Sequence, residues 1–486
     1  MVTTPRVLDT EPVRTLDAYV TNGGGTGLDA ARKLGPAATI DEIDASGLRG
    51  RGGAGFPTGT KWRTVAANAA ASLPATVVVN GAEGEPGSFK DRAIVRSNPY
   101  RVLEGALIAA HAVGADGVVV AVKESFTTEI ARLLAAVDDV RAAGWADGIS
   151  LTVHEGPGAY LYGEETALLE AINGRPPFPR VAPPFRHGVE VVADLPPDQA
   201  AGVGAGDIEL AGAGAATPAP PTLVNNVETL AHVAGIMAGG PAWFRSVGTA
   251  ATPGTVVVTI SGSTVRHGVA EVATGTPLRR VIDEIGGGPR GQRVVAVLSG
   301  VSNPLLLADA LDTPLDFDAM AAVGNGLGAA GFIVLDDSDD LVAVAHGVSR
   351  FLAVESCGQC TPCKQDGRAL SEVLERLRRS SAASDDLTIL TDRAATVTDG
   401  ARCYLAQQHQ RVVESLLQGF PEVVAAHAAG ASEEVEPYLV AAIVDHDGER
   451  FTLDEGHATK QPDWTHDDED SGAAPADHID RDAGPT

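Results

Sequence analysis

Cysteine, aromatic residues and positive charge are all scarce in this sequence of 486 residues. Only four residues are cysteine, which is too few for a disulfide framework and favours a reducing compartment. Lysine and arginine total 36 against 64 aspartates and glutamates, so the formal net charge is −28. Nucleic-acid binding depends on clustered positive charge, so this balance argues against a nucleic-acid partner.

Long apolar runs are also lacking. None reaches the roughly 18 residues that can span a bilayer, so we expect no direct membrane insertion. The first residues, MVTTPRVLDTEPVRT, do not have the basic-then-apolar layout of a signal peptide. We therefore expect a cytoplasmic protein. Its length and its 44% hydrophobic content predict two or three globular domains.

A dense glycine cluster, RGRGGAGFPTGTKW at residues 49–62, is the most conspicuous local feature. Its four closely spaced glycines are Gly50, Gly52, Gly53 and Gly55. Such a loop lets backbone N–H groups approach an anion, and Lys61 adds a cation for a phosphate. An ordinary flexible loop is the alternative. Lys61 is followed by Trp62, which does not fit the Walker pattern, and no good hydrophobic strand precedes the loop, which weakens a dinucleotide fingerprint.

Strands and helices alternate after this loop. β-Branched runs predict buried strands at residues 75–80, 117–122 and 149–154, with helices at 100–113 and 127–137. This alternation indicates an α/β layer whose loops at the strand ends are places for ligands.

Acidic residues lie in two of those loops. The first, NGAEGEPGS, carries Glu83 and Glu85. The second, GPGAYLYGEETALLE, brings Gly163, Glu164 and Glu165 to the start of a helix. The two adjacent acids have an alternative role, because acids at a helix N-terminus complement its dipole.

The rest of the chain can be divided into segments by the spacing of its apolar residues. An Ala-, Gly- and Pro-rich stretch at residues 189–220 predicts an extended loop or insertion, and PTLVNNVET at 221–229 is expected to open a helix. Strands at 255–261 and 294–298 with a helix at 275–285 suggest a β-grasp-like domain over 250–335.

Helical periodicity begins near residue 345 and continues to about 430. One face of this part carries Leu370, Val373, Leu374 and Leu377, as in a helical bundle. A hairpin around Asp447-Gly448 is expected within residues 438–453. From about Asp463 the sequence is acidic with Gly and Pro, and we expect disorder there.

The cysteines carry the strongest chemical signal. Cys357, Cys360 and Cys363 form a CxxCxxC run, and Cys403 follows about forty residues later. Three closely spaced thiolates and a distant fourth are typical of a [4Fe–4S] cluster. A tetrahedral zinc site with four cysteines is the rival, although such sites usually use two separate CxxC pairs. A cluster would indicate electron transfer.

Taken together, the motifs resemble one family, the flavoprotein subunit of respiratory complex I and the related diaphorase subunits of NAD-dependent formate dehydrogenases and NAD-reducing hydrogenases. The resemblance rests on RGRGGAGFPTGTKW, NGAEGEPGSFKDR, GAYLYGEETALLE, PRVAPPF, PTLVNNVET and ESCGQCTPC with the late Cys403. These motifs occur in the family's order between about residues 45 and 410.

The resemblance implies a domain order. It comprises an N-terminal lead-in (1–45), an FMN/NAD-binding α/β domain (46–245), a β-grasp-like (SLBB) domain (250–335), a helical [4Fe–4S] domain (345–430) and a C-terminal extension (431–486). The implied cofactors are FMN and the cluster, with NAD(H) as the substrate nucleotide. The implied partners are a thioredoxin-like [2Fe–2S] subunit and a further iron–sulfur subunit, in a complex that is cytoplasmic or peripheral on the inner face of a membrane.

The resemblance also implies residue roles. The FMN ligands would be Gly50, Gly52, Gly53, Gly55, Lys61, Asn80, Glu83, Gly163, Glu164, Glu165, Asn225 and Asn226. Glu85 and Glu165 would be the catalytic acids, and Phe56, Phe185 and Glu85 would face the nucleotide. The cluster ligands would be the four cysteines.

Three positions depart from the family's pattern. Ala82 replaces an aspartate, Ala182 replaces a lysine expected to meet the nucleotide, and Thr64 replaces an adenine-stacking aromatic of complex I. The leading hypothesis is a diaphorase subunit that moves hydride between NAD(H) and FMN and single electrons to the cluster. The alternatives are a flavin and iron–sulfur relay that has lost NADH binding, and a structural subunit without turnover.

Overall fold

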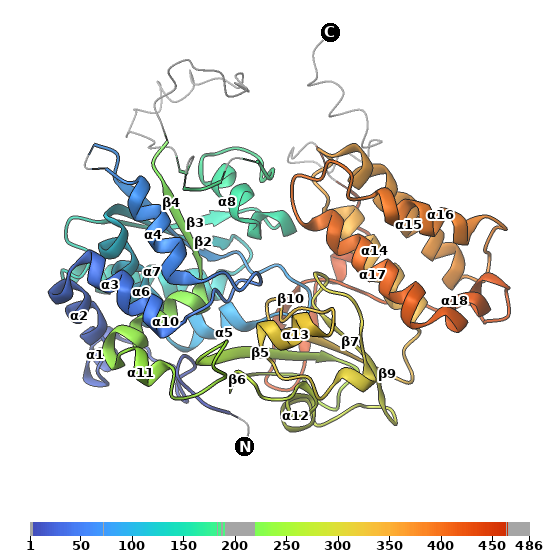
Figure 1. Cartoon of the computed structure of the whole chain (residues 1–486), viewed down its shortest axis with the longest axis horizontal. Coiled ribbons are helices and arrows are strands. Elements are labelled where there is room, and N and C mark those ends of the chain that lie inside the picture. The colour runs from blue at the N-terminus through green and yellow to red at the C-terminus, as the bar shows by residue number, and fades with distance from the viewer. Residues whose placement is uncertain are drawn as a thin grey trace, which may run out of the picture.

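The computed structural model describes residues 3–70, 72–181, 183–185, 188–189, 219–462 and Trp464. It has three parts: a parallel sheet with helices, a mixed sheet, and a group of helices that contains the cysteine motif (Figure 1). Ala182, nearly all of the expected insertion and the tail beyond Trp464 lie outside the described residues.

The first part is built on a four-stranded parallel sheet in the order β3-β2-β1-β4. Its strands are β1 (Ala75–Gly81), β2 (Ala115–Lys123), β3 (Ser150–Gly156) and β4 (Thr222–Asn226). The valines of β1 are fully buried. A parallel sheet is covered on both faces, which is why its strands are continuous apolar runs. The three predicted strands of this part are confirmed.

Helices on this part cover the sheet and form its core. The larger ones are α2 (Thr26–Leu34), α3 (Pro36–Ser46), α4 (Thr58–Asn68), α5 (Lys90–Ser97), α6 (Pro99–Val113), α7 (Thr127–Ala142), α8 (Glu165–Ile172) and α10 (Val227–Gly239). Shorter ones are α1 (Leu16–Thr21) and α11 (Pro241–Phe244). The described lead-in contains three helices, and Tyr19 and Ile43 on two of them are buried in the same core.

The prediction for residues 221–229 is wrong in its first half. PTLVNN does not open a helix: Thr222–Asn226 is strand β4, and α10 begins at Val227. Leu223 and Val224 pair with Val77 and Val78 of β1, and burial against that strand outweighs the local helical pattern. The side chain of Asn226 then caps α10 by accepting from the backbone N–H of Glu228.

The second part is a five-stranded mixed sheet in the order β6-β5-β9-β7-β8. Its strands are β5 (Thr255–Gly262), β6 (Gly268–Ala273), β7 (Val294–Ser299), β8 (Leu306–Leu307) and β9 (Gly331–Asp336). β5 and β9 run parallel, and the other pairs are antiparallel. The expected helix at 275–285 begins later, as α12 (Leu278–Val281) followed by a π-helical turn, and α13 (Phe317–Ala322) lies on the same part.

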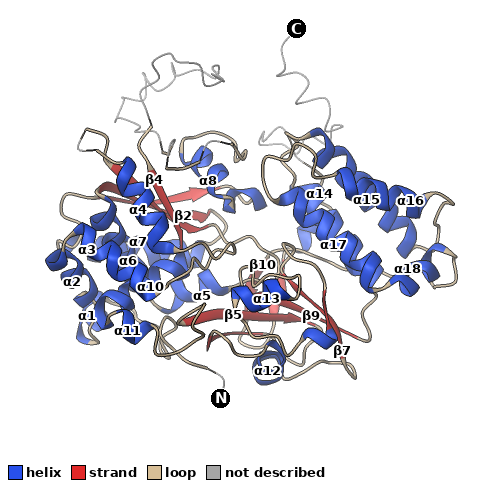
Figure 2. Cartoon of the chain, in the orientation of Figure 1, coloured by secondary structure: helices blue, strands red, loops and turns tan. Residues whose placement is uncertain are grey.

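The third part is entirely helical up to residue 428 (Figure 2). Its helices are α14 (Leu341–Glu355), α15 (Thr361–Arg378), α16 (Asp386–Thr396), α17 (Leu405–Gly419) and α18 (Pro421–Ala428). The leucine face predicted on α15 is buried in their shared core. Cys360 lies directly before α15, and Cys403 lies just before α17.

The C-terminal extension returns to the other two parts. Strands β10 (Ile443–His446) and β11 (Phe451–Leu453) form the predicted hairpin, which packs on Phe89 of the first part. The expectation of disorder from Asp463 is wrong at Trp464, whose side chain is 1% exposed. Within the described residues, no helix combines the length and the apolarity needed to cross a membrane.

Candidate redox site

A cavity of about 780 Å³ lies where the three parts meet. Four segments of the first part line it: the glycine loop, the residues after β1, the turn before α8 and the end of β4. The second part contributes residues 302–303, 317–318, 321 and 325–329, and the third part contributes residues 403–405 and 408. Strands β1 and β4 both deliver their carboxyl ends to this place, where α/β sheets bind ligands.

The glycine loop joins α3 to α4, so no strand precedes it and the dinucleotide fingerprint does not apply. The predicted Gly50, Gly52, Gly53 and Gly55 all line the cavity. Gly53 has φ +124°, a region that L side chains rarely adopt. Between them, Arg51 is 2% exposed, and its guanidinium donates to the carbonyls of Pro253 and Thr255. The loop is thus anchored to the second part and is not an ordinary flexible connection.

The three predicted asparagines come together at the ends of neighbouring strands. Asn80 of β1 is in register with Asn226 of β4, and Asn225 precedes it. Asn80 donates to the carbonyl of Gly163 at 2.9 Å, and Asn225 accepts from Trp62 Nε1 at 2.8 Å. These contacts orient the amides on the cavity wall, which Gly163 also lines.

Glu83 is buried and paired with Arg92, Nε to Oε2 at 3.1 Å. Burial alone would raise its pKa, but the positive charges of Arg92 and Lys90 outweigh it and the pKa of Glu83 is lowered. Glu83 also accepts from the hydroxyl of Ser88 and the backbone N–H of Asp91. Glu83 is therefore held as a carboxylate at the cavity.

Sequence reasoning did not single out Ser88, Lys90 and Asp91, which also line the cavity. Lys90 is buried, and its ammonium contacts Asp91 at 2.7 Å, Asn226 at 3.0 Å and Glu228 at 3.1 Å. The only available signal was the Lys-Asp-Arg run that follows the acidic loop. A charge run of this kind is ordinarily a solvated surface, so the pattern alone could not show burial.

Glu164 and Glu165 play different parts. Glu164 caps α8 by accepting from the backbone N–H groups of Thr166 and Ala167, as the helix-dipole alternative predicted. Burial raises the pKa of Glu164 despite these bonds. Glu165 forms an ion pair with Lys61 of α4. All three of Lys61, Glu164 and Glu165 line the cavity, so the capping role and the site role coexist.

Glu85 connects all three parts. Its Oε1 accepts from the backbone N–H groups of Val301 and Ser302 and from the Ser302 hydroxyl, and its Oε2 accepts from the phenol of Tyr160 at 2.6 Å. Tyr160 in turn contacts Gln408 of α17. Burial raises the pKa of Glu85 even though these hydrogen bonds oppose the shift.

Of the predicted aromatic residues and the positions that depart from the family's pattern, some line the cavity and others do not. Phe56 lines the cavity with 53% of its surface exposed, and Ala82 also lies on the wall. Among the described residues of that wall, Phe185 and Thr64 do not appear. Phe185 packs against the hydrophobic core of the first part, and the Thr64 hydroxyl donates to a carbonyl of its own helix. The sequence did not indicate Asn303, Phe317 or Asn325, because the second part has no local motif.

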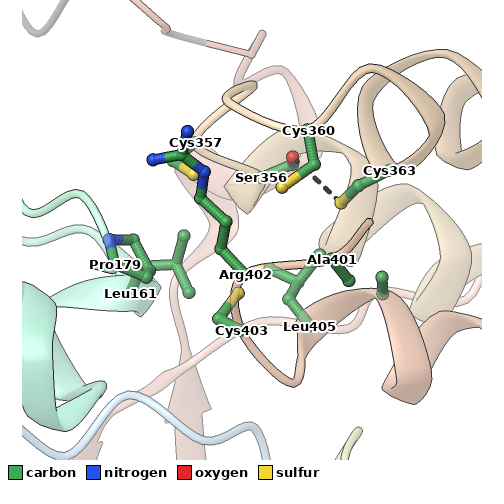
Figure 3. Close-up of a pocket in the computed structure, with 11 residues that line it drawn as sticks. Leu161, Pro179, Ser356, Cys357, Cys360, Cys363, Ala401, Arg402, Cys403 and Leu405 are labelled. Atoms are coloured by element: carbon green, nitrogen blue, oxygen red, sulfur yellow. Dashed lines mark hydrogen bonds between the residues drawn. The ribbon is translucent and has the colours of Figure 1, made fainter. Parts of the chain in front are cut away.

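The four cysteines line a second, smaller pocket, together with Leu161 and Pro179 of the first part (Figure 3). Ser356 Oγ lies 3.4 Å from Cys363 Sγ, and Gln359 donates to Cys357 Sγ. All four are free thiols. Burial raises the pKa of Cys357, and it raises those of Cys363 and Cys403 to about 12, so ligation there would release protons.

The four thiols fit either a zinc ion or an iron–sulfur cluster. Tetrahedral zinc needs four sulfurs at about 2.3 Å from one centre. Four cysteines around one pocket are equally the donor set of a [4Fe–4S] cluster.

The two cavities share part of their walls. Leu161, Cys403 and Leu405 line both of them. A group held by the cysteines and a group held in the larger cavity would therefore be close neighbours.

Comparison with known proteins agrees with this geometry. Residues 43–235 match the model of the Nuo51 FMN-binding domain, and residues 343–427 match that of the NADH-ubiquinone oxidoreductase-F iron–sulfur binding region. The second F subunit of NADH-quinone oxidoreductase in Rhizobium meliloti (strain 1021) is 35% identical over 434 residues, which cover 87% of this chain and 96% of that relative.

The chain belongs to the family of NADH-quinone oxidoreductase F subunits. The F subunit of Mycobacterium tuberculosis (strain ATCC 25618 / H37Rv) is also 35% identical, over 87% of this chain and 92% of the relative. The fold resembles a chain of the NAD⁺-reducing [NiFe]-hydrogenase in its H₂-reduced state, with a TM-score of 0.72, 30% identity, and coverage of 90% of this chain and 68% of that one.

Membership of this family confirms the resemblance drawn from the motifs and decides against zinc. The cofactors are FMN, in the part that contains the glycine loop, and a [4Fe–4S] cluster in the helical part. NADH is the substrate of the family. The residues present fit both groups: a glycine-lined wall with oriented amides for the flavin, and four free thiols around one pocket for the cluster.

Proposed function

We propose that this chain is the diaphorase subunit of a larger complex, in which the main cavity holds FMN beside NADH and the cysteine pocket holds the [4Fe–4S] cluster. The observation that carries the proposal is the shared wall formed by Leu161, Cys403 and Leu405. Hydride transfer moves electrons in pairs, whereas an iron–sulfur cluster accepts them singly, and bound FMN supplies the chemistry that converts one into the other.

The glycine loop would bind the phosphate end of the flavin. Its backbone can approach closely, and Lys61 on the first turn of α4 supplies a positive charge. Asn80, Asn225 and Asn226 would orient the ring system, since amides offer both donors and acceptors. Glu83, fixed as a carboxylate by Arg92, would accept a hydrogen bond from the flavin.

Glu85 and Glu165 would act on the nucleotide side. A carboxylate near the nicotinamide favours the positively charged product, NAD⁺. Phe56, an exposed aromatic residue on this wall, would contact the adenine end. Phe185 lies in the core contacts, so its nucleotide role would require the chain around it to move.

Leu161 and Leu405 place apolar side chains on the wall that the two cavities share. They would exclude water from the space between flavin and cluster while keeping the two groups close. Cys403 would place one cluster ligand on this shared wall.

The finer fold also belongs to this proposal. The strand order β6-β5-β9-β7-β8, with β5 and β9 parallel and central, supports a β-grasp-like second domain. The packing of α14, α15 and α17 around one core supports a helical bundle for the third. We propose the domain limits 46–245, 250–335 and 345–430 as stated from the sequence.

We further propose that the chain works in the cytoplasm, free or on the inner face of a membrane complex. Its relatives are named as subunits of NADH-quinone oxidoreductases, and a structural neighbour is an NAD⁺-reducing hydrogenase. A thioredoxin-like [2Fe–2S] subunit and a further iron–sulfur subunit are the partners that the family resemblance implies. Neither nucleic acid nor lipid is required.

An anaerobic titration of the reconstituted protein with NADH tests the function. We expect the flavin absorbance to bleach near one equivalent of NADH, and ferricyanide to accept the electrons. A flavin that dithionite reduces but NADH does not would refute the diaphorase and support the relay alternative. Ala82 is the described substitution on the cavity wall that would favour that result.

A further inference from the structure

The segment that follows the C-terminal hairpin packs against the start of the cysteine loop. Here residues 455–462 and Trp464 are called the C-terminal strap. Two consecutive residues, Glu355 and Ser356, end α14 and lead into Cys357. The strap contacts both of them, and neither contact belongs to the thiol ligands or to the flavin cavity.

The contact with Glu355 is ionic and buried. Its Oε1 faces His457 Nε2 at 3.2 Å and Lys460 Nζ at 2.5 Å, while its Oε2 accepts from the backbone N–H of Tyr160 at 2.9 Å. Arg350, one turn earlier on α14, donates to the carbonyls of His457 and Lys460. The His457 ring also stacks on Phe351, with centroids 4.8 Å apart.

The contact with Ser356 is made by Trp464. Its indole Nε1 donates to the Ser356 carbonyl at 2.6 Å, and the side chain is 1% exposed. The ring lies against Gly358, where an added Cβ would come within 2.8 Å of it. Lys364, on the first turns of α15, places its ammonium 4.5 Å from the ring centroid. The indole therefore touches the loop on both sides of Cys357.

We propose that the strap is a positioning device for the [4Fe–4S] cluster, with Trp464 and Glu355 as positioning residues. By holding the Ser356 carbonyl and covering Gly358, the strap fixes the turn that presents Cys357 and keeps water from that side of the pocket. Ser356 also contacts Cys363 through its hydroxyl, so one residue transmits the constraint to two ligands.

The direction of the effect follows from charge. Reduction adds an electron to a cluster that its thiolates already make negative, and water stabilises the more negative form. Removing the indole therefore raises the reduction potential. It also opens a path by which a chelator or oxygen reaches the iron, so the cluster is lost faster.

The test compares Trp464→Ala and Trp464→Phe in the full-length, reconstituted protein. For Trp464→Ala we expect several-fold faster loss of iron to a chelator and a more positive potential in a redox titration followed by EPR, with FMN content unchanged. Trp464→Phe keeps most of the packing but loses the N–H, so its rate of iron loss and its reduction potential should lie between those of the parent protein and Trp464→Ala. In the apoprotein, Trp464→Ala speeds amide exchange at residues 356–360.

Trp243→Phe is the matched control, because Trp243 lies in the first part and contacts Arg6. An unchanged chelation rate and potential in Trp464→Ala, or equal effects in Trp243→Phe and Trp464→Phe, would overturn the proposal. If Trp464→Ala does not fold, Lys460→Gln tests the same role. Faster loss of iron to the chelator in this variant supports a positioning role for the strap, and an unchanged rate of iron loss refutes it.

The role of the strap rests on the cluster and not on the electron donor. A protein that NADH fails to bleach, but whose cluster responds to Trp464→Ala, would support the strap while refuting the diaphorase.

Discussion

Single residues at the redox site often hold two functions that the sequence presents as alternatives. Glu164 is both the cap of α8 and part of the cavity wall. Lys61 is both an ion-pair partner of Glu165 and part of the cavity wall. A charged side chain at a helix terminus satisfies backbone groups with one set of atoms and leaves others for a ligand.

Cys403→Ser tests the distant cluster ligand. We expect the cluster to be lost or destabilised, because the hydroxyl is a poor iron ligand, while flavin binding is largely retained. Iron analysis and EPR measure the first effect, and flavin absorbance after gel filtration measures the second. A variant with full iron content and an unchanged spectrum would show that Cys403 is not a ligand.

Lys61→Gln tests the cation of the glycine loop. Loss of a hydrogen bond from a charged group should weaken FMN binding by roughly 10- to 100-fold. Fluorescence titration of the apoprotein with FMN gives the affinity. Lys33→Gln, at an exposed position on α2, is the matched control and should bind FMN normally. Equal affinities in the two variants would contradict the phosphate role.

At the scale of elements, the glycine loop depends on both its own conformation and its neighbour in the second part. Gly55 has φ +62°, and a Cβ there would lie 2.6 Å from the ring of Phe317. Phe317 begins α13, and the Arg49 guanidinium lies over its ring. The ring of Phe317 therefore leaves no room for a side chain at position 55.

Gly55→Ala should disturb this contact. The residue would need an unfavourable backbone conformation, which costs about 1–2 kcal/mol, and would also collide with Phe317. We expect a lower thermal midpoint and weaker FMN retention. Gly114→Ala is the control, since Gly114 has φ +70° with nothing within 4 Å of an added Cβ. Equal losses in both variants would mean that the Phe317 contact is unimportant.

At the scale of the whole molecule, buried charges join the parts. Glu228 at the start of α10 accepts from the backbone N–H of Val257 in β5 and pairs with Lys90 of α5. Burial alone would raise the pKa of Glu228, but Lys90, His232 and Arg51 outweigh burial and lower this pKa to about 2. The hydrogen bond from Val257 thus ties the mixed sheet to the flavin part, where the ion pair with Lys90 holds Glu228 in place.

The pH dependence of stability follows from that shift. A carboxyl with a lowered pKa stabilises the fold fully above its ordinary pKa of 4.5 and loses that contribution as the pH falls toward about 2. Glu228→Gln should cost about 3–5 kcal/mol near neutral pH, because it leaves Lys90 short of a buried partner. The difference between variant and parent should shrink between pH 4.5 and 2 in thermal unfolding scans. A difference that is constant over this range would refute the assignment.

Much of the fold and site could be predicted from the sequence where the pattern is local. The valine run of β1, the leucine face of α15 and the spacing of the cysteines are physical consequences of short stretches of chain. Strand β4 was missed, because only pairing with β1 makes PTLVNN extended. The tail was misjudged at Trp464, because its acidic surroundings conceal one buried indole.

The sequence by itself determined which chemical groups this protein has: four thiols for a cluster, a dense glycine loop with a lysine, and acids and amides in the loops that follow predicted strands. Only the tertiary structure decided how these are joined. Glu85 accepts hydrogen bonds from the second part and from Tyr160. Leu161 and Cys403 line both cavities. Trp464 contacts the cysteine loop from about a hundred residues away in the sequence. The physical reason is that reactive groups are carried by residue type, whereas burial and proximity depend on packing between segments that no local pattern connects.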